Sequence, residues 1–153
     1  MEIIFLNPVF KEKIWGGSKL KEEFDYKIPS EKTGECWAIS AHENGDCTIV
    51  NGEFKGKTLS WIYKNHRELF GNIKNDKFPL LVKILDAKEK LSVQVHPDDE
   101  YAWENENGEY GKTECWYILD CKKDGDLILG HNANSKEEMK EMIHKSKWDE
   151  FIR

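Results

Sequence analysis

The stretch Leu91-Ser-Val-Gln-Val-His-Pro97 is the part of this sequence that most directly indicates its fold, because apolar and polar residues alternate as in a β-strand. Successive side chains of a strand point to opposite faces, so Ser92, Gln94 and His96 share one face and three apolar residues share the other. Pro97 favours an extended His96 and donates no backbone hydrogen bond. The stretch therefore predicts a strand that carries polar side chains on one face and ends at its histidine.

A second stretch, Gly111-Lys-Thr-Glu-Cys-Trp-Tyr117, alternates in the same way and places Lys112 and Glu114 on one face. If the two strands are neighbours, the amide of Gln94, the imidazole of His96 and the carboxylate of Glu114 can bind one ion. This mixed nitrogen and oxygen set suits zinc with an open coordination position, or alternatively manganese or iron(II). The spacing is a weak pattern, so a merely solvated or hydrogen-bonded role for each side chain stays open.

Short apolar or β-branched runs between turn residues recur along the chain and predict strands. They cover Cys36 to Ala41, Cys47 to Val50, Pro79 to Leu85, Leu91 to His96, Glu114 to Leu119 and Leu127 to Leu129. Short and mostly consecutive strands favour an antiparallel barrel or sandwich. No repeat, linker or interior boundary interrupts residues 1–153, so we expect a single unit.

Helix signals interrupt these strands at three places. Thr58 can cap a helix that ends at Gly71, and Ser135 with Glu138 forms a capping-box pattern at the start of a second helix. Pro97 is expected at the first position of a short acidic helix. Two smaller features have structural interpretations: Gly16-Gly17 is expected to form a turn, and Cys115, opposite Glu114, is expected to be buried.

Composition narrows the class of protein. Of the 153 residues 39% are hydrophobic and 12% aromatic, which argues against disorder and allows one domain with a sizeable core. The formal charge of −6 disfavours nucleic acid as a partner. The first residues lack a secretion signal, and no apolar run is long enough to span a membrane. The four cysteines form no C-x-x-C pair, so we expect reduced thiols and a cytoplasmic location.

The two stretches described first, together with Phe78-Pro-Leu-Leu-Val-Lys-Ile-Leu-Asp86 and Gly34-Glu-Cys-Trp37, resemble type I mannose-6-phosphate isomerase, a zinc-dependent family of the cupin superfamily. The likeness begins near Asn7-Pro8 and Ile14-Trp-Gly-Gly17 and runs to the end of the chain. It implies a mainly β fold with short helices, a cupin-like (jelly-roll) antiparallel β-barrel. It also implies interconversion of mannose 6-phosphate and fructose 6-phosphate through an enediol, with a sugar phosphate as substrate.

The resemblance also assigns roles to individual residues. Gln94, His96 and Glu114 match three of the family's ligands for one Zn²⁺ ion. Ser92 and Lys112 match residues at the phosphate end of the substrate. The group that moves the proton is not identified by this chain.

One departure from the family pattern is serious. The family's fourth zinc ligand is a histidine in a later Pro-x-Gly-x-x-His segment, followed by a catalytic-site arginine, and nothing after Glu114 has that pattern. His131 follows a glycine and His144 lies in a predicted helix, so neither matches. We therefore expect an N-terminal part of the enzyme, with an incomplete barrel, weaker zinc binding, and a need for a complementary C-terminal chain or self-association.

Two other classes remain as alternatives. A cupin-type metal- or sugar-binding module without catalytic activity would keep both stretches and lose turnover, which the missing histidine and arginine favour. A non-haem iron cupin oxygenase fits less well, because Gln94 replaces the first histidine of the usual H-x-H arrangement.

Overall fold

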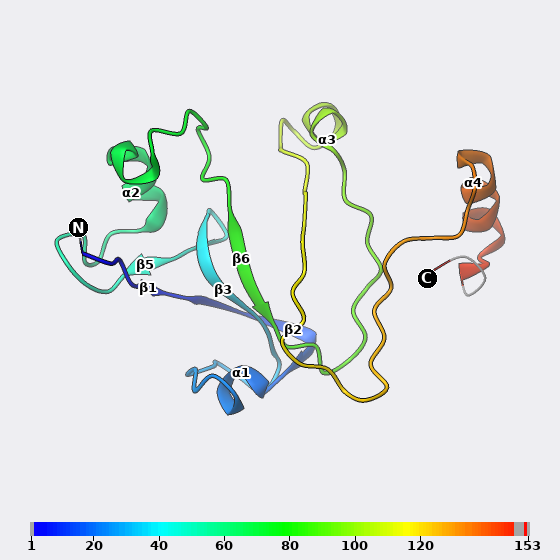
Figure 1. Ribbon diagram of the computed structural model, residues 1–153, viewed down its shortest axis with the longest axis horizontal. Helices are drawn as coiled ribbons and strands as arrows, with labels where there is room; N and C mark the ends of the chain where they lie inside the picture. The colour runs from blue at the N-terminus through cyan, green and yellow to red at the C-terminus, as the bar shows by residue number, and fades with distance from the viewer. Residues whose placement is uncertain (1, 149–151, 153) are drawn as a thin grey trace. The chain divides into compact units, whose positions relative to one another are not determined.

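The structure, a computed structural model, describes residues 2–148 and 152 of the chain. The chain divides into two compact units, Met1–Leu91 and Ser92–Arg153, and each is described by itself. Figure 1 shows that the strands belong to the first unit and that the second consists of two short helices joined by long irregular segments. The expectation of a single unit over residues 1–153 stays a prediction.

A four-stranded antiparallel sheet forms the centre of the first unit, and its longest strand, β3, pairs with each of the others (Figure 1). Its strands are β2 (Val9–Gly17), β3 (Thr33–His42), β4 (Gly45–Asp46) and β6 (Leu81–Leu85). Two shorter strands, β1 (Leu6–Asn7) and β5 (Thr48–Ile49), form a separate antiparallel pair. The strands expected around residues 36–41, 47–50 and 79–85 are therefore confirmed.

The core of the first unit gathers around β3 because small and apolar side chains of this strand are removed from water. Thr33, Cys36 and Ser40 have no exposed surface, and Trp37 is 9% exposed. The other buried apolar residues of this unit come from flanking elements; they are Leu20, Cys47, Ile49, Leu59, Ile62 and Tyr63. Burial of apolar area on this scale is the main favourable contribution to folding.

Gly16 and Gly17 do not form the expected turn; they are the last residues of β2. A Cβ atom on Gly16 would lie 2.4 Å from the carbonyl oxygen of Lys32 and 2.5 Å from the nitrogen of Gly34. The register between β2 and β3 also shifts between Glu12 and Gly17. The turn prediction was wrong because glycine serves here to let two backbones approach closely.

The helix expected after Thr58 is confirmed as α2 (Leu59–Asn65), followed by a 3-10 helix, η1 (Arg67–Phe70). The Thr58 hydroxyl accepts a hydrogen bond from the backbone N–H of Trp61 at 3.2 Å. Gly71 ends the segment in the left-handed conformation, with φ 68°. A further four-residue helix, α1 (Lys19–Glu22), follows β2.

The second unit contains α3 (Asp99–Asn105) and α4 (Lys136–Lys145). Ser135 caps α4 as expected, because its hydroxyl accepts a hydrogen bond from the backbone N–H of Glu138 at 3.1 Å. Pro97 is not the first residue of α3; Asp98 is its cap and accepts from the N–H of Tyr101 at 2.9 Å. The Asp98 carboxylate can accept a hydrogen bond from a free backbone N–H at the start of the helix, whereas a proline side chain cannot. The helix therefore begins after Asp98. No helix in the described residues is long and apolar enough to cross a membrane.

Three expected strands, over residues 91–96, 114–119 and 127–129, are not formed as hydrogen-bonded strands. A β-strand needs a neighbouring strand to which its backbone can hydrogen-bond. In the described part of the chain, these three stretches do not pair with such a strand. The fold class is confirmed as mainly β with short helices and antiparallel sheets. The described sheets do not close into a barrel, in agreement with the expected incompleteness.

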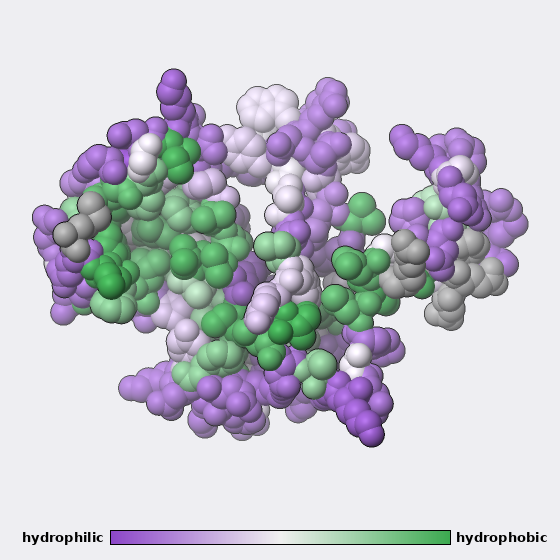
Figure 2. Space-filling model, viewed as in Figure 1, coloured by the Kyte–Doolittle hydropathy of each residue, from purple (hydrophilic) through white to green (hydrophobic). Residues whose placement is uncertain are grey.

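Apolar side chains in these unpaired stretches of the second unit lie open to solvent. Val95 is 96% exposed, Tyr117 is 87% exposed and Leu129 is 79% exposed. Among the described residues of this unit only Ala102 and Met142 are buried apolar residues. Figure 2 shows hydrophobic side chains on the visible surface. The second unit therefore presents the apolar residues of its expected strands without covering them.

Candidate metal and substrate site

All five residues singled out for metal or substrate binding belong to the second unit, on the two segments that flank α3 (Figure 1). Ser92, Gln94 and His96 precede the helix, and Lys112 and Glu114 follow it. The backbone N–H of Lys112 donates a hydrogen bond to the carbonyl oxygen of Pro97 at 3.0 Å. This bond brings the two segments together where His96 ends the first and Lys112 begins the second.

A tight turn after α3 makes this return possible. Asn107 and Gly108 both have positive φ angles, 55° and 75°, which reverse the chain. The Asp99 carboxylate then accepts a hydrogen bond from the backbone N–H of Gly111 at 2.8 Å. A Cβ atom on Gly111 would lie 2.5 Å from the carbonyl carbon of Asp98, so only glycine fits there without movement. The loop is therefore fixed against the start of the helix.

Three of the five side chains meet directly. His96 Nε2 lies 3.0 Å from Glu114 Oε2, and Lys112 Nζ lies 2.9 Å from Glu114 Oε1. Lys112 Nζ also lies 3.3 Å from His96 Nε2. The side chains are partly exposed, at 25% for His96, 35% for Glu114 and 47% for Lys112. The imidazole nitrogen of His96 and the carboxylate of Glu114 thus both face the ammonium of Lys112 at a solvent-accessible position.

The other two side chains contact each other. The Gln94 amide donates a hydrogen bond through Nε2 to the Ser92 hydroxyl at 3.0 Å. The alternation expected of a strand explains this contact, because residues two apart share a face. The structure thus brings His96, Lys112 and Glu114 together and pairs Gln94 with Ser92. Within the described residues, no three His, Cys, Asp or Glu side chains form a metal-binding group.

The charges around Glu114 favour its ionised form. Partial burial raises the pKa of Glu114, but the hydrogen bond and charge of Lys112, the charge of His96 and a hydrogen bond from Trp116 outweigh it. The net pKa of the carboxyl is lowered from its ordinary value. Glu114 is therefore a carboxylate at neutral pH, the form that binds a metal ion.

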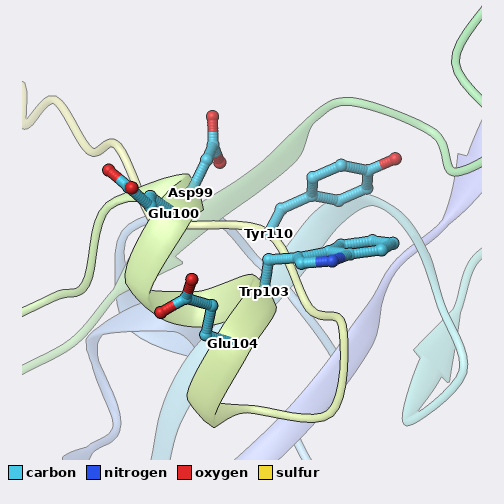
Figure 3. Close-up of a pocket in the computed structure, with 5 residues that line it drawn as sticks. All are labelled: Asp99, Glu100, Trp103, Glu104 and Tyr110. Carbon is cyan, nitrogen blue, oxygen red and sulfur yellow. The ribbon is translucent and has the colours of Figure 1, made fainter.

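A surface cavity of about 360 Å³ lies elsewhere in the second unit, between α3 and the loop that follows it. Figure 3 shows the rings of Trp103 and Tyr110 side by side, with carboxylates on the helix next to them. It is lined by Asp99, Glu100, Trp103, Glu104 and Tyr110. None of these is a predicted metal or substrate residue, and three carboxylates would repel a phosphate group. We therefore do not assign the sugar phosphate to this cavity.

The thiols differ in their surroundings. Cys36 and Cys47 are buried, whereas Cys115 and Cys121 are exposed. The expectation of a buried Cys115 was wrong, because the strand expected to contain Cys115 is not formed. All four are free thiols in the structure. Burial raises the pKa of Cys36 to about 11, so this thiol is protonated and unreactive at neutral pH.

A buried glutamate in the first unit was missed by the sequence-based interpretation. Glu35, on β3, is 8% exposed, and its carboxylate accepts a hydrogen bond from Trp37 Nε1 at 2.6 Å. Lys13 and Lys83 each place an ammonium 3.4 Å from this carboxylate. The signal was present, since Glu35 lies in the otherwise uncharged run Gly34-Glu-Cys-Trp37, and a charge in such a strand needs partners.

This cluster predicts a pH effect on the stability of the first unit. Burial raises the pKa of Glu35, but the Trp37 hydrogen bond and the charges of Lys83 and Lys13 outweigh it and lower the pKa. A lowered folded-state pKa stabilises the fold above the ordinary carboxyl pKa of about 4.3, and that contribution is lost as pH falls through the lowered value. In the Glu35→Gln variant, the free energy of unfolding should therefore fall less steeply as the pH is lowered. Chemical denaturation at a series of pH values between about 3 and 7 measures this slope. An unchanged slope would show that Glu35 does not contribute.

Comparison with known proteins relates this geometry to a family. Residues 3–123 match the model of the type I phosphomannose isomerase catalytic domain. The chain is 59% identical over 152 residues to mannose-6-phosphate isomerase ManA of Bacillus subtilis and 55% identical over 151 residues to mannose-6-phosphate isomerase of Streptococcus mutans. These matches cover 99% of this chain and 48% of each relative.

A solved structure agrees with these matches. The crystal structure of mannose 6-phosphate isomerase from Bacillus subtilis superposes with a TM-score of 0.95 at 59% identity. The superposition covers 98% of this chain and 48% of that one. The chain thus spans about half the length of the curated relatives it matches.

Proposed function

This chain belongs to the type I phosphomannose isomerase family, and from that premise we propose that it forms part of an enzyme that interconverts mannose 6-phosphate and fructose 6-phosphate. The observation that carries the proposal is the 59% identity to ManA over nearly the whole chain. The meeting of His96, Glu114 and Lys112 supports it from the structure, because the family's reaction needs a cation site beside a phosphate-binding group.

We propose Zn²⁺ as the cofactor, one ion per site, with Gln94, His96 and Glu114 as its ligands. The donor chemistry fits, since an imidazole nitrogen, a carboxylate oxygen and an amide oxygen are suitable zinc ligands. The ionised carboxylate of Glu114 also attracts positive charge, as its contact with the Lys112 ammonium shows. Gln94 donates to Ser92 through its NH₂ group, so that bond does not engage its carbonyl oxygen.

The chemical roles follow from these residue types. Bound zinc would supply a Lewis acid that polarises the sugar oxygens and stabilises negative charge on an enediolate. His96 and Glu114 would hold the ion, together with Gln94. Lys112 would bind the phosphate as a positive point charge, and the Ser92 hydroxyl would add a hydrogen bond. A cytoplasmic location, expected from the reduced thiols, stays a prediction.

We also propose that a complementary C-terminal chain is needed for a complete site. The relatives are about twice as long, and exposed apolar side chains in the second unit such as Val95 and Tyr117 are suited to cover by further strands. The family's fourth ligand, a later histidine, would come from that part. Self-association of this chain is the alternative means of covering the same side chains.

An isomerase assay tests the proposed function. The chain is purified with added zinc, and a chimera joins residues 1–153 to the remaining half of ManA. We expect formation of fructose 6-phosphate from mannose 6-phosphate by the chimera, and turnover far lower by the chain alone, because the ManA half would supply the fourth ligand.

Variants of the chimera provide the controls. Gln94→Ala and Glu114→Ala should each abolish turnover while circular dichroism shows an unchanged fold, and exchange of the exposed Lys140 for Met should have no effect. A folded, zinc-loaded chimera without turnover would contradict the proposal. It would favour the alternative of a binding module without catalytic activity. One observation supports this alternative: of the three proposed ligands, only His96 and Glu114 contact each other.

A further inference from the structure

Lys112 occupies an unusual place for a residue expected to bind phosphate. Its ammonium is 2.9 Å from Glu114 Oε1 and 3.3 Å from His96 Nε2, and these two residues contact each other at 3.0 Å. The positive charge of the lysine therefore faces the two donor groups at which a divalent cation would bind. One position cannot hold both, because two cations in contact repel each other.

The backbone around Lys112 is held next to His96. The Lys112 N–H donates to the carbonyl oxygen of Pro97, next to His96, at 3.0 Å. The preceding Gly111 is held by Asp99 and is packed too closely against Asp98 for any side chain. The main chain thus places the start of the Lys112 side chain beside His96, and the alternation of the segment places Glu114 on the same face.

From this geometry we propose that Lys112 competes with a divalent cation for Glu114 and His96. The inference rests on the proposed metal site and adds a function to it. A cation that binds Glu114 displaces the ammonium, and Lys112 then becomes available for an anionic group such as the substrate phosphate. Metal binding and phosphate binding are thereby coupled through one side chain.

The size of the competition can be bounded. A partly exposed ion pair contributes little free energy, but metal binding must break the pair of Lys112 and Glu114. The displaced ammonium stays nearby and still repels a doubly charged ion. Removing the charge of Lys112 should therefore raise the affinity for a divalent cation roughly tenfold or more. A variant that keeps a positive charge at position 112 should keep the low affinity for a divalent cation.

The test measures zinc affinity of the full chain by competition with a chromogenic chelator at fixed pH and ionic strength. The Lys112→Met variant should bind zinc more tightly than the original chain. The Lys112→Arg variant should have nearly the zinc affinity of the original chain. Lys140→Met is the matched control, because it removes the same charge from an exposed position on α4. We expect less than a roughly twofold change there, since a distant exposed charge is screened.

A His96→Ala variant separates the two proposals. Loss of zinc affinity in His96→Ala with no gain in Lys112→Met would overturn the competition and leave the metal site standing. Equal gains in Lys112→Met and Lys140→Met would overturn it as well, because only net charge would then matter. Unchanged affinity in His96→Ala would remove the proposed metal site and the competition with it. Circular dichroism of each variant confirms that the compared chains are folded.

Discussion

Replacement of Glu114 with glutamine should lower the zinc affinity of this chain by roughly a hundredfold or more. Loss of an outer partner of a metal ligand already costs about 10- to 100-fold in affinity, and Glu114 is a proposed direct ligand. The change keeps the size of the side chain but removes the negative charge that faces His96 and Lys112. The measurement is a zinc titration of both chains against a chelator of known affinity.

A comparison with Glu137→Gln makes this result specific. Glu137 is an exposed carboxylate in the first turn of α4, so its loss changes net charge equally without touching the candidate site. We expect near-original zinc affinity for this control. Breaking the partly exposed pair of Lys112 and Glu114 should cost the fold at most about 1 kcal/mol, so Glu114→Gln should remain folded. Equal zinc affinity in both variants would place the metal at other residues.

Gly16→Ala should cause a large loss of stability in the first unit. The added methyl would lie 2.4 Å from the carbonyl oxygen of Lys32 and 2.7 Å from its carbonyl carbon. These are backbone atoms of the segment that enters β3, so relief of the clash requires β2 and β3 to separate. Overpacking in a core costs about 1–3 kcal/mol, and we expect a destabilisation at or above the upper end. Denaturant unfolding followed by tryptophan fluorescence measures it.

Gly56→Ala is the matched control for this prediction. Nothing lies within 4 Å of a Cβ atom at Gly56, but its φ of 85° disfavours any residue with a side chain. Alanine there should cost about 1–2 kcal/mol, the ordinary penalty of a left-handed conformation. If Gly16→Ala lost no more stability than this control, the close approach of β2 and β3 would not be a constraint.

Local signals were sufficient to predict the two helices that follow Thr58 and Ser135. Thr58 and Ser135 each cap a helix with the side-chain hydrogen bond that their position predicts, and Gly71 ends the first helix in a left-handed conformation. Such signals are reliable because donor and acceptor lie within one turn of the same chain. The central part of β3 was likewise apparent from the run of small and apolar residues from Cys36 to Ala41.

Strands that depend on distant partners were predicted less well. The strand expected over residues 91–96 is not formed, although its alternation is clear, because a hydrogen-bonded neighbour must come from elsewhere. β2 was missed because Gly16 and Gly17 suggested a turn, whereas they permit the close approach of Lys32 and Gly34. Neither outcome can be derived from the residues of one segment alone.

The sequence by itself determined the family, the mainly β fold class, the helix boundaries set by local caps, and the five residues to consider as ligands. Only the tertiary structure decided which of them meet: His96, Glu114 and Lys112 converge, and Gln94 pairs with Ser92. It also showed that Glu35 is buried beside two lysines. The physical reason is that alternation assigns a face within one strand, whereas contact between strands depends on turns, backbone hydrogen bonds and close packing.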